Sequence, residues 1–450
     1  MDSASVDVRI NAGLVFTAAG EEIFGGVVEV SGDTISHVGS KPTEATAVET
    51  VEARGQILVP GLVNTHAHTS QQLGRGLADD VDLLRWLRER IWPYESSLNE
   101  ADSEVSALVC ALEQIRNGVT TIADPGGQHV DGMARGLKRS GIRALLGRSS
   151  MDEGIGLPAV WNQSTEECLA IQDDLADRWH GAANGRLRMS YTLRTIFNCS
   201  DALITESAER GLRLGTPVQM HVAEIREENQ HAIATRGVST IRHLHRLGVL
   251  GPGLLAAHLV FVDDEEIGMV AETGTAVSHN PAAAMRVLGF PRIADMLERD
   301  ILVSIGTDGA PCNNRMSMID EMWLASLLQK AMRNDPTVLP ARQVLRMATI
   351  DGARALGWDG EIGSLEPGKK ADLALVDPLS VNMTPVHDSV SALVTSRKSE
   401  NVRSVMCDGR WLLRDRVITV CDEAEVLAEA QVRAEALRPA GVVGFRSLDR

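Results

Sequence analysis

Two histidines that are two positions apart suggest metal chemistry. His66 and His68 lie in the stretch VNTHAHTS, directly after an apolar run. Alternate residues of a β-strand face the same side, so both imidazoles can reach one ion. Such pairs also occur on ordinary protein surfaces, so the indication depends on further ligands elsewhere in the chain.

Further candidate ligands end four later apolar runs. These residues are His221 in VQMHVAE, His258 in AAHLV, His279 in VSHN and Asp308 in SIGTDG. Histidines with only a structural role in the core would not be expected to recur at the same end of each run. Imidazoles and one carboxylate suit zinc or ferrous iron with an open position for water. We expect one divalent metal, Zn²⁺ with Fe²⁺ as the alternative, held by His66, His68, His221 and Asp308.

Two residues near these ligands could move protons. Glu224 follows His221 by three positions, where the chain leaves the run and can turn back over its end. It could carry a proton to the substrate, or it could be an ordinary carboxylate at the start of a helix. His258 could hold the attacking water or shuttle its proton.

The absence of lysine in the centre of the chain limits the number of metals. No lysine occurs between Lys138 and Lys330. The fourth, fifth and sixth apolar runs therefore hold no lysine that could be carbamylated to bridge two ions. One metal is expected.

The elements that must position these residues are predicted to form a (β/α)8 barrel. Eight apolar runs alternate with helical patterns such as 101–117 and 239–247. The runs are QILVPGLV, VTTIAD, IRALLGR, LRMSYTL, TPVQMHV, LLAAHLV, TAVSHN and ILVSIGTD. Active sites of such barrels form at the carboxyl ends of the strands, which is where the candidate residues lie. An open doubly wound sheet is the alternative, but no glycine-rich phosphate loop follows the first run.

Both ends of the chain are rich in short strands. Gly32-Asp33 separates VVEVS from TISHV, and Asp408-Gly409 separates VRSVMC from RWLLRD, which predicts two hairpins. We therefore expect an α/β fold with a TIM-type (β/α)8 barrel and a small β-sandwich domain built from both termini. The expected boundaries are 1–59 and 365–422 for the sandwich, 60–364 for the barrel and 423–450 for a helical tail.

The composition excludes several other functions. Of 450 residues, 44% are hydrophobic and 23% charged, as in globular proteins. The net charge of −17 makes nucleic acid an unsuitable partner. No run is long enough to span a membrane, and the start MDSASVDVRI lacks a secretory pattern. Six cysteines without a CxxC pair indicate reduced thiols, so we expect a cytoplasmic protein.

These motifs together resemble the amidohydrolase superfamily, in its mononuclear aminohydrolase branch. The resemblance covers nearly the whole chain and rests on PGLVNTHAH, HVAE, SHNP, GTDGA, MATIDGARALG and GSLEPGKKADLALVD. The chain looks most like the 5-methylthioadenosine/S-adenosylhomocysteine deaminases, with the triazine hydrolases nearby. Family members are commonly oligomers, so a homodimer or homotetramer is expected.

The resemblance implies hydrolytic deamination of an amino-substituted N-heterocycle. Asp308 would deprotonate a water activated by the metal, His258 would hold it, and Glu224 would protonate the ring nitrogen next to the attacked carbon. The expected substrate is a small adenosine-type nucleoside or a related purine. The alternatives are removal of chloride or an (alkyl)amino group from an s-triazine, and a catalytically dead scaffold, which the presence of the four ligands disfavours.

The resemblance also implies a substrate pocket. Glu95, in IWPYE, matches a glutamate that binds ribose hydroxyls, and Arg148 matches an arginine of the same pocket. Each could instead be a structural residue, a surface carboxylate or a salt-bridged arginine at the barrel rim. We further expect His258, His279 and Cys312 to contact substrate. Cys312 stands four positions after Asp308, where the triazine deaminases tend to carry cysteine, but it could equally be a small loop residue.

Two positions depart from the deaminase pattern. Arg194 replaces a histidine, and Ala282–Ala284 replaces the polar residues that follow SHNP. The pocket thereby gains a cation and loses hydrogen-bonding groups. The hypothesis is that Arg194 contacts a substrate that carries an anion or lacks the adenosine sugar.

Overall fold

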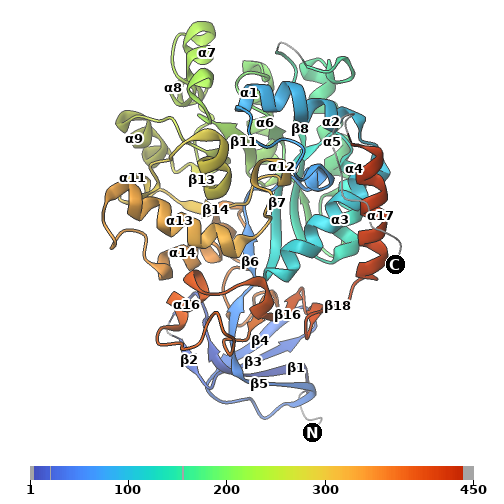
Figure 1. The fold of residues 1–450 in the computed structure, drawn as a ribbon, viewed down its shortest axis with the longest axis vertical. Coiled ribbons are helices and arrows are strands. Elements are labelled where there is room, and N and C mark those ends of the chain that lie inside the picture. Colours follow the sequence, from blue (N-terminus) through green and yellow to red (C-terminus); the bar gives the residue numbers. More distant parts are fainter. Residues whose placement is uncertain (1–4, 21, 155–156, 439–450) are drawn as a thin grey trace.

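The computed structural model describes residues 5–20, 22–154 and 157–438. The strands form two sheets. One is built from both ends of the chain, and the other, from the centre of the chain, forms a barrel. In Figure 1 the blue and orange-red elements of the two ends lie together below the barrel. No helix among the described residues is both long and apolar enough to cross a membrane.

The terminal sheet joins strands that are more than 300 positions apart. β5 pairs in parallel with β1 and antiparallel with β15, so the two ends of the chain share one sheet. The strand order is β18-β17-β16-β15-β5-β1-β3-β4, with β2 beside β1. The strands are β1 (Ser5–Val15), β2 (Ile23–Phe24), β3 (Val27–Ser31), β4 (Thr34–Gly39), β5 (Thr46–Pro60), β15 (Leu373–Val376), β16 (Val402–Cys407), β17 (Arg410–Arg414) and β18 (Val417–Ile418). The expected sandwich is therefore one continuous nine-stranded sheet.

Apolar side chains explain why this sheet is stable. Ile10, Val28, Leu58 and Leu373 are fully buried in a cluster of their own, separate from the barrel core. Both predicted hairpins are present, β3 with β4 and β16 with β17, and each is antiparallel.

The central strands form the predicted parallel barrel. Their order is β14-β13-β12-β11-β10-β8-β7-β6, with β9 beside β8. The chain segments beyond β14 and β6 close the circle, because Thr65 N–H donates to the Ile305 carbonyl at 3.0 Å and Thr307 N–H to the His66 carbonyl at 3.0 Å. The strands are β6 (Leu62–Asn64), β7 (Val119–Gly127), β8 (Arg143–Ser150), β9 (Leu187–Met189), β10 (Thr192–Leu193), β11 (Val218–Val222), β12 (Leu254–His258), β13 (Ala276–His279) and β14 (Val303–Ile305).

Two predicted barrel strands are divided. The first run is shared between two strands: it belongs to β5 of the terminal sheet as far as Pro60 and to β6 of the barrel from Leu62. Gly61 makes the crossing possible, since a Cβ there would lie 2.1 Å from Thr120 Oγ1. The fourth run splits into β9 and β10, each of which pairs with β8.

Helices surround the barrel strands (Figure 1). The two predicted helices are present as α3 and α8, and Asn99 and Asp102 form a capping box at the start of α3. The longer helices are α3 (Glu100–Arg116), α4 (Val130–Ser140), α5 (Thr165–Trp179), α6 (Asp201–Leu214), α7 (Arg226–Arg236), α8 (Thr240–Arg246), α9 (Asp264–Thr273), α13 (Met318–Arg333), α14 (Ala341–Met347), α16 (Ser389–Thr395) and α17 (Glu423–Ala436). The shorter ones are η1 (Thr69–Gly74), α1 (Leu83–Arg85), η2 (Trp86–Ile91), α2 (Trp92–Ser97), η3 (Ala159–Trp161), α10 (Pro281–Ala283), η4 (Ala284–Leu288), α11 (Ile293–Leu297), α12 (Ala310–Asn313), α15 (Ile350–Ala355) and η5 (Ser399–Asn401). The predicted helical tail is α17, and positions 439–450 lie outside the described residues.

A buried ionic cluster joins the barrel to the terminal sheet. Arg143, at the start of β8, contacts Asp372 at 3.1 Å and Asp408 at 3.2 Å. Arg186 also contacts Asp408, at 3.1 Å. The side chains of Arg143 and both aspartates are at most 2% exposed, so each charge depends on its partners.

Candidate active site

The candidate metal ligands meet at the carboxyl ends of the barrel strands. His66 and His68 follow β6, His221 lies in β11, and Asp308 follows β14. All four are buried. Because parallel strands of a barrel end at the same rim, residues from distant parts of the chain converge there.

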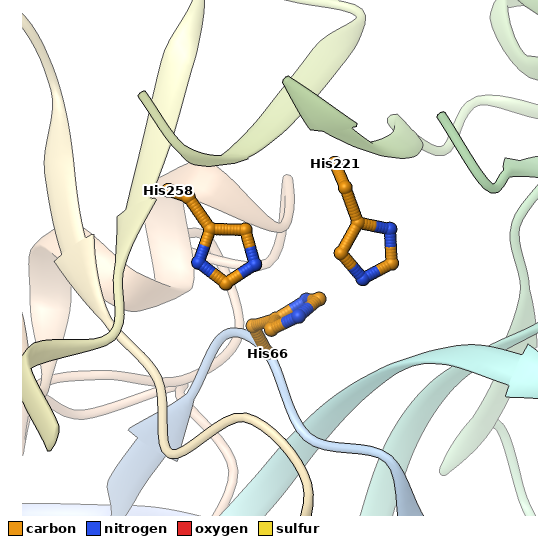
Figure 2. A group of neighbouring side chains, drawn as sticks. All are labelled: His66, His221 and His258. Carbon is orange, nitrogen blue, oxygen red and sulfur yellow. The ribbon is translucent and has the colours of Figure 1, made fainter. Parts of the chain in front are cut away.

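The ligand atoms lie close enough to share one ion. Nε2 of His68 is 3.2 Å from Nε2 of His221, and Asp308 Oδ1 is 3.6 Å from His66 Nε2 and 3.5 Å from His68 Nε2. His66, His68 and Asp308 form one group of potential ligands, and His66, His221 and His258 form another. Figure 2 shows the rings of His66, His221 and His258 converging on a common space.

The protonation states fit a divalent cation. Burial, followed by the charge of His66, holds the pKa values of His68 and His221 well below their usual range, so both rings are neutral with a lone pair to offer. Nδ1 of His221 lies 2.8 Å from the Arg194 carbonyl, which fixes that nitrogen as the donor and leaves Nε2 facing the cluster. His66 Nε2 is buried without a hydrogen-bond partner among the described residues. Three imidazoles and one carboxylate therefore fit a zinc or ferrous ion.

His258 is placed to handle a proton. The Asn280 side-chain amide donates to its Nδ1 at 3.2 Å, which leaves the proton of the neutral ring on Nε2. Nε2 lies 3.5 Å from Glu224 Oε1 and 3.8 Å from Asp308 Oδ2. Burial lowers the pKa of His258 to about 3. Nε2 of His258 has no hydrogen-bond partner among the described residues, so its N–H faces the space between Glu224 and Asp308.

Glu224 is a buried acid whose environment favours the protonated side chain. Burial, followed by the charges of Glu228 and Asp308, raises its pKa well above the usual range. Glu228 accepts hydrogen bonds from the backbone N–H groups of Ala223 and Glu224, both at 2.8 Å, and so holds the segment that carries Glu224. Sequence reasoning missed Glu228, although its place as the third residue of REEN, four positions after Glu224, was the available signal.

Backbone strain marks the same strand ends. Ala223, His258 and Asp308 have φ values of +51°, +80° and +62°. Residues other than glycine rarely adopt such values, and those that do cluster at functional sites. The strain aims His258 and Asp308 into the barrel mouth.

Two predicted substrate residues form a buried ion pair beside the ligands. Arg194 Nη1 lies 3.6 Å from Glu95 Oε2, and both side chains are buried. Gln71 donates to the other oxygen of Glu95 at 2.7 Å. Arg194 lines the cleft together with His68, His221, Glu224 and Asp308. Sequence reasoning did not foresee that Arg194 would pair with Glu95.

Cys312 also lines the cleft. Its thiol donates to the Gly309 carbonyl at 3.1 Å. Burial, followed by the charge of Asp308, raises the pKa of the thiol well above its usual range. Cys312 therefore presents a neutral S–H beside the carboxylate.

Four of the predicted substrate residues do not line the cleft, namely Glu95, Arg148, His258 and His279. Arg148 donates to Gln128 Oε1 at 2.6 Å, on the segment after β7. His279 is fully buried, and neither of its ring nitrogens has a hydrogen-bond partner in the described part of the chain. Burial, followed by the charge of His258, lowers its pKa to about 3. The structure thus places Arg148 and His279 outside the lining of the cleft.

The walls themselves are mostly apolar and were not predicted. Trp86 and Leu87 come from η2, and Val287 and Leu288 from η4. Flat apolar surface of this kind suits a heteroaromatic ring.

A second buried carboxylate supports the wall, and sequence reasoning missed it as well. Glu321 of α13 accepts from Ala282 N–H at 2.9 Å and from the Asn313 side chain at 2.8 Å. It therefore ties the segment after β13 to the segment after β14. Burial raises the pKa of Glu321 to about 8.

The comparison with known families gives one match that spans most of the chain. The model of the Amidohydrolase family matches residues 57–412. A 5′-deoxyadenosine deaminase of Methanosarcina mazei is 38% identical over 414 residues, covering 92% of this chain and 93% of the relative. A 5-methylthioadenosine/S-adenosylhomocysteine deaminase of Syntrophomonas wolfei is 36% identical over 389 residues, covering 86% and 88%.

Solved structures share the fold. An adenosine deaminase from Xanthomonas campestris with bound zinc has a TM-score of 0.91 at 30% identity, covering 97% of this chain and 99% of that one. A triazine hydrolase from an Arthrobacter has a TM-score of 0.88 at 24% identity, covering 96% and 100%. At that identity the second likeness shows the fold alone.

Proposed function

The chain belongs to the amidohydrolase family, and from that membership we propose that it is a metal-dependent deaminase of adenosine-type nucleosides. It is a hydrolase that acts on carbon–nitrogen bonds of cyclic amidines. The observation that carries the proposal is the arrangement of three imidazoles and one carboxylate beside the buried glutamic acid Glu224 and the histidine His258.

The resident metal is proposed to be one divalent ion, Zn²⁺, held by His66, His68, His221 and Asp308. The bound zinc of the similar adenosine deaminase supports this choice, with Fe²⁺ as the alternative. When bound, such an ion acts as a Lewis acid that makes water nucleophilic at neutral pH.

The protein groups divide the proton transfers among them. Asp308 accepts a proton from the attacking water, and His258 Nε2–H orients that water from the opposite side. Glu224 donates its proton to the ring nitrogen next to the carbon under attack. Asp308 then passes its proton to the amino group, the carbon–nitrogen bond breaks and ammonia leaves as the carbonyl forms. The remaining proton of the attacking water leaves the new hydroxyl group and restores Glu224. Each group has the protonation state that its role requires, because burial and neighbouring charges set it.

Substrate selection is proposed to involve Arg194 and Cys312, which line the cleft, together with Glu95 beside Arg194 and with His258. Glu95 would accept hydrogen bonds from sugar hydroxyls, and Arg194 is the cation that pairs with it in this buried site. Arg148 and His279, which do not line the cleft, would affect substrate binding indirectly, through the residues that do line it. The names of the relatives support a nucleoside over a triazine.

The test is ammonia release by the zinc-loaded protein. The panel holds adenosine, 5′-deoxyadenosine, methylthioadenosine, adenosylhomocysteine, guanine, melamine and a chlorinated triazine. Turnover of one adenosine-type compound supports the proposal. Chloride release, or turnover of a bare ring alone, contradicts it and favours the triazine alternative.

We propose that the protein is cytoplasmic. All six cysteines are free thiols and five are buried, as in a reducing cytoplasm. Assembly as a homodimer or homotetramer stays a prediction.

A further inference from the structure

His68 and His221 are oriented in different ways, although both are proposed metal ligands. Nδ1 of His221 lies 2.8 Å from the Arg194 carbonyl, so a hydrogen bond fixes the plane of its ring. Nδ1 of His68 is buried and has no hydrogen-bond partner in the described part of the chain. Histidine ligands are usually oriented by a hydrogen bond at the nitrogen that does not face the metal. The orientation of His68 therefore depends on how its backbone is held.

The strand β7 holds the backbone on both sides of His68. Ala67 N–H donates to the Ala123 carbonyl at 2.9 Å. The next residue of β7 is Asp124, whose carboxylate accepts two hydrogen bonds from Thr69. One comes from the Thr69 backbone N–H at 3.0 Å, and the other comes from its hydroxyl group. His68 thus lies between two residues that one strand fixes.

Asp124 and Thr69 are themselves held firmly. The other carboxylate oxygen of Asp124 accepts from Gly126 N–H at 2.7 Å, and Asp124 is fully buried. The Ser106 hydroxyl of α3 donates to the Thr69 carbonyl at 2.8 Å. Three donors thus satisfy the buried carboxylate, and all three polar groups of Thr69 have partners. This complete pairing favours a single arrangement of the segment that follows His68.

The start of η1 explains why a carboxylate from another strand is needed. His68 is the N-cap of η1, a position where Ser, Thr, Asp or Asn usually accepts from free backbone N–H groups. The side chain of His68 makes no such hydrogen bond, and its Nε2 lies 3.2 Å from Nε2 of His221 instead. Thr69 N–H is one of the free groups, and Asp124 accepts from it. Asp124 therefore supplies the cap that a metal-binding side chain cannot provide.

We propose that Asp124 is a positioning residue for the metal centre and acts through Thr69 on His68. The inference rests on the proposed metal-dependent function, and Asp124 itself is neither in the ligand set nor in the lining of the cleft. The two hydrogen bonds from Thr69 keep Nε2 of His68 directed at the other ligands.

The experiment measures the zinc Kd by competition with a chromophoric chelator, together with the visible spectrum of the cobalt(II) form, which reports ligand geometry. Asp124→Asn places an amide NH₂ group against a backbone N–H donor, so it is expected to raise the zinc Kd about 10–100-fold and to change the cobalt spectrum. Thr69→Val removes only the hydroxyl hydrogen bond and is expected to raise the Kd by up to about tenfold. Thr69→Ser keeps both donors and should bind zinc like the natural protein.

Asp152→Asn is the matched control. The carboxylate of Asp152 accepts from the N–H of Ser200 at 2.8 Å and from its hydroxyl at 2.6 Å. Ser200 is the N-cap of α6, so this substitution disturbs the same kind of hydrogen-bond pair at a helix that carries no metal ligand. The zinc Kd and the cobalt spectrum of this variant should equal those of the natural protein.

The outcomes separate positioning from general stability. Excess zinc should restore deamination in the Asp124 variant, because its ligands remain. A natural zinc Kd and cobalt spectrum in that variant overturn the positioning role, and so does an equal loss of affinity in the Asp124 and Asp152 variants. If Asp124→Asn does not fold, as judged by circular dichroism, equal Kd values for Thr69→Val and Thr69→Ser overturn the role. Failure of the natural protein to bind zinc contradicts the proposed metal centre itself.

Discussion

Nε2 of His68 and Nε2 of His221 lie 3.2 Å apart, although their strands stand on opposite sides of the barrel. Both rings are neutral because burial lowers their pKa values. Two neutral imidazoles share at most one proton between such atoms, whereas a cation satisfies both lone pairs. This contact links a position after the first barrel strand to one in the fifth.

Replacing His221 tests that relationship. Loss of a residue that only hydrogen-bonds to a metal ligand lowers metal affinity by roughly 10–100-fold. Because His221 is proposed to be a ligand itself, His221→Ala is expected to lower metal affinity by more than this and to abolish deamination. Metal content by mass spectrometry after dialysis and activity with added zinc are the measurements. His245→Ala, at an exposed histidine of α8, should retain the ion. Full metal content in the His221 variant would exclude His221 as a ligand.

Glu224→Gln should separate proton transfer from metal binding. The amide cannot donate an acidic proton to the ring, so kcat is expected to fall about 10²–10⁴-fold with the metal content unchanged. Steady-state kinetics and metal analysis measure the two effects. Glu227→Gln, an exposed neighbour in α7, is the control that should keep kcat. A Glu224 variant with the natural kcat would remove this residue from the mechanism.

The Arg194–Glu95 pair predicts a coupling between the two residues. Arg194→Met leaves the Glu95 carboxylate buried without its cation, which is expected to cost about 3–5 kcal/mol of unfolding free energy and to raise KM for a nucleoside. Adding Glu95→Gln should recover much of the stability, because the unpaired charge is gone, without restoring KM. Urea unfolding of the four proteins in the cycle measures this. Arg213→Met at an exposed position of α6 controls for the substitution itself, and additive effects would contradict the pairing.

Glu321 predicts a pH dependence of stability. Its folded pKa of about 8 lies above the unfolded value, so between about pH 4.5 and 8 the folded state holds a proton that the unfolded state has lost. This group therefore favours folding at low pH and loses that contribution as the pH rises towards 8. Compared with Glu321→Gln, the natural protein should lose unfolding free energy over this window by up to about 1.4 kcal/mol per pH unit, the effect of one proton.

Urea midpoints between pH 5 and 9 provide the measurement for Glu321. Glu272→Gln, at an exposed position of α9, should follow the natural protein throughout. Parallel curves for the natural protein and the Glu321 variant would show that Glu321 is ionised in the folded state.

Much of the fold and the metal ligands at the centre of the site could be predicted, because the sequence itself indicates where the barrel strands end. An apolar run that ends in histidine or aspartate indicates both the strand and the direction of its carboxyl end. His66, His221 and Asp308 could therefore be grouped before their distances were known. The hairpins at Gly32 and Asp408 were visible for the same reason, since turn chemistry is local.

The cleft walls and their supports could not be found in this way. Glu321 acts on the backbone of Ala282, 39 positions away, and no side-chain pattern records a backbone partner. Trp86 looks like an ordinary core residue until the path of η2 is known. Arg148 stands at a strand end like the ligands, yet its side chain turns to Gln128.

The ionic cluster around Arg143 makes the barrel inseparable from the terminal sheet. An excised fragment covering the barrel alone would keep the buried guanidinium of Arg143 and lose Asp372 and Asp408, leaving a cation without a counterion in a dry environment. The two ends of the chain must therefore be synthesised and paired before the barrel is stable, and the whole molecule should unfold as one cooperative unit. If this barrel were transferred to another protein without the terminal sheet, Arg143 would lose Asp372 and Asp408. An apolar residue would then be required in place of Arg143.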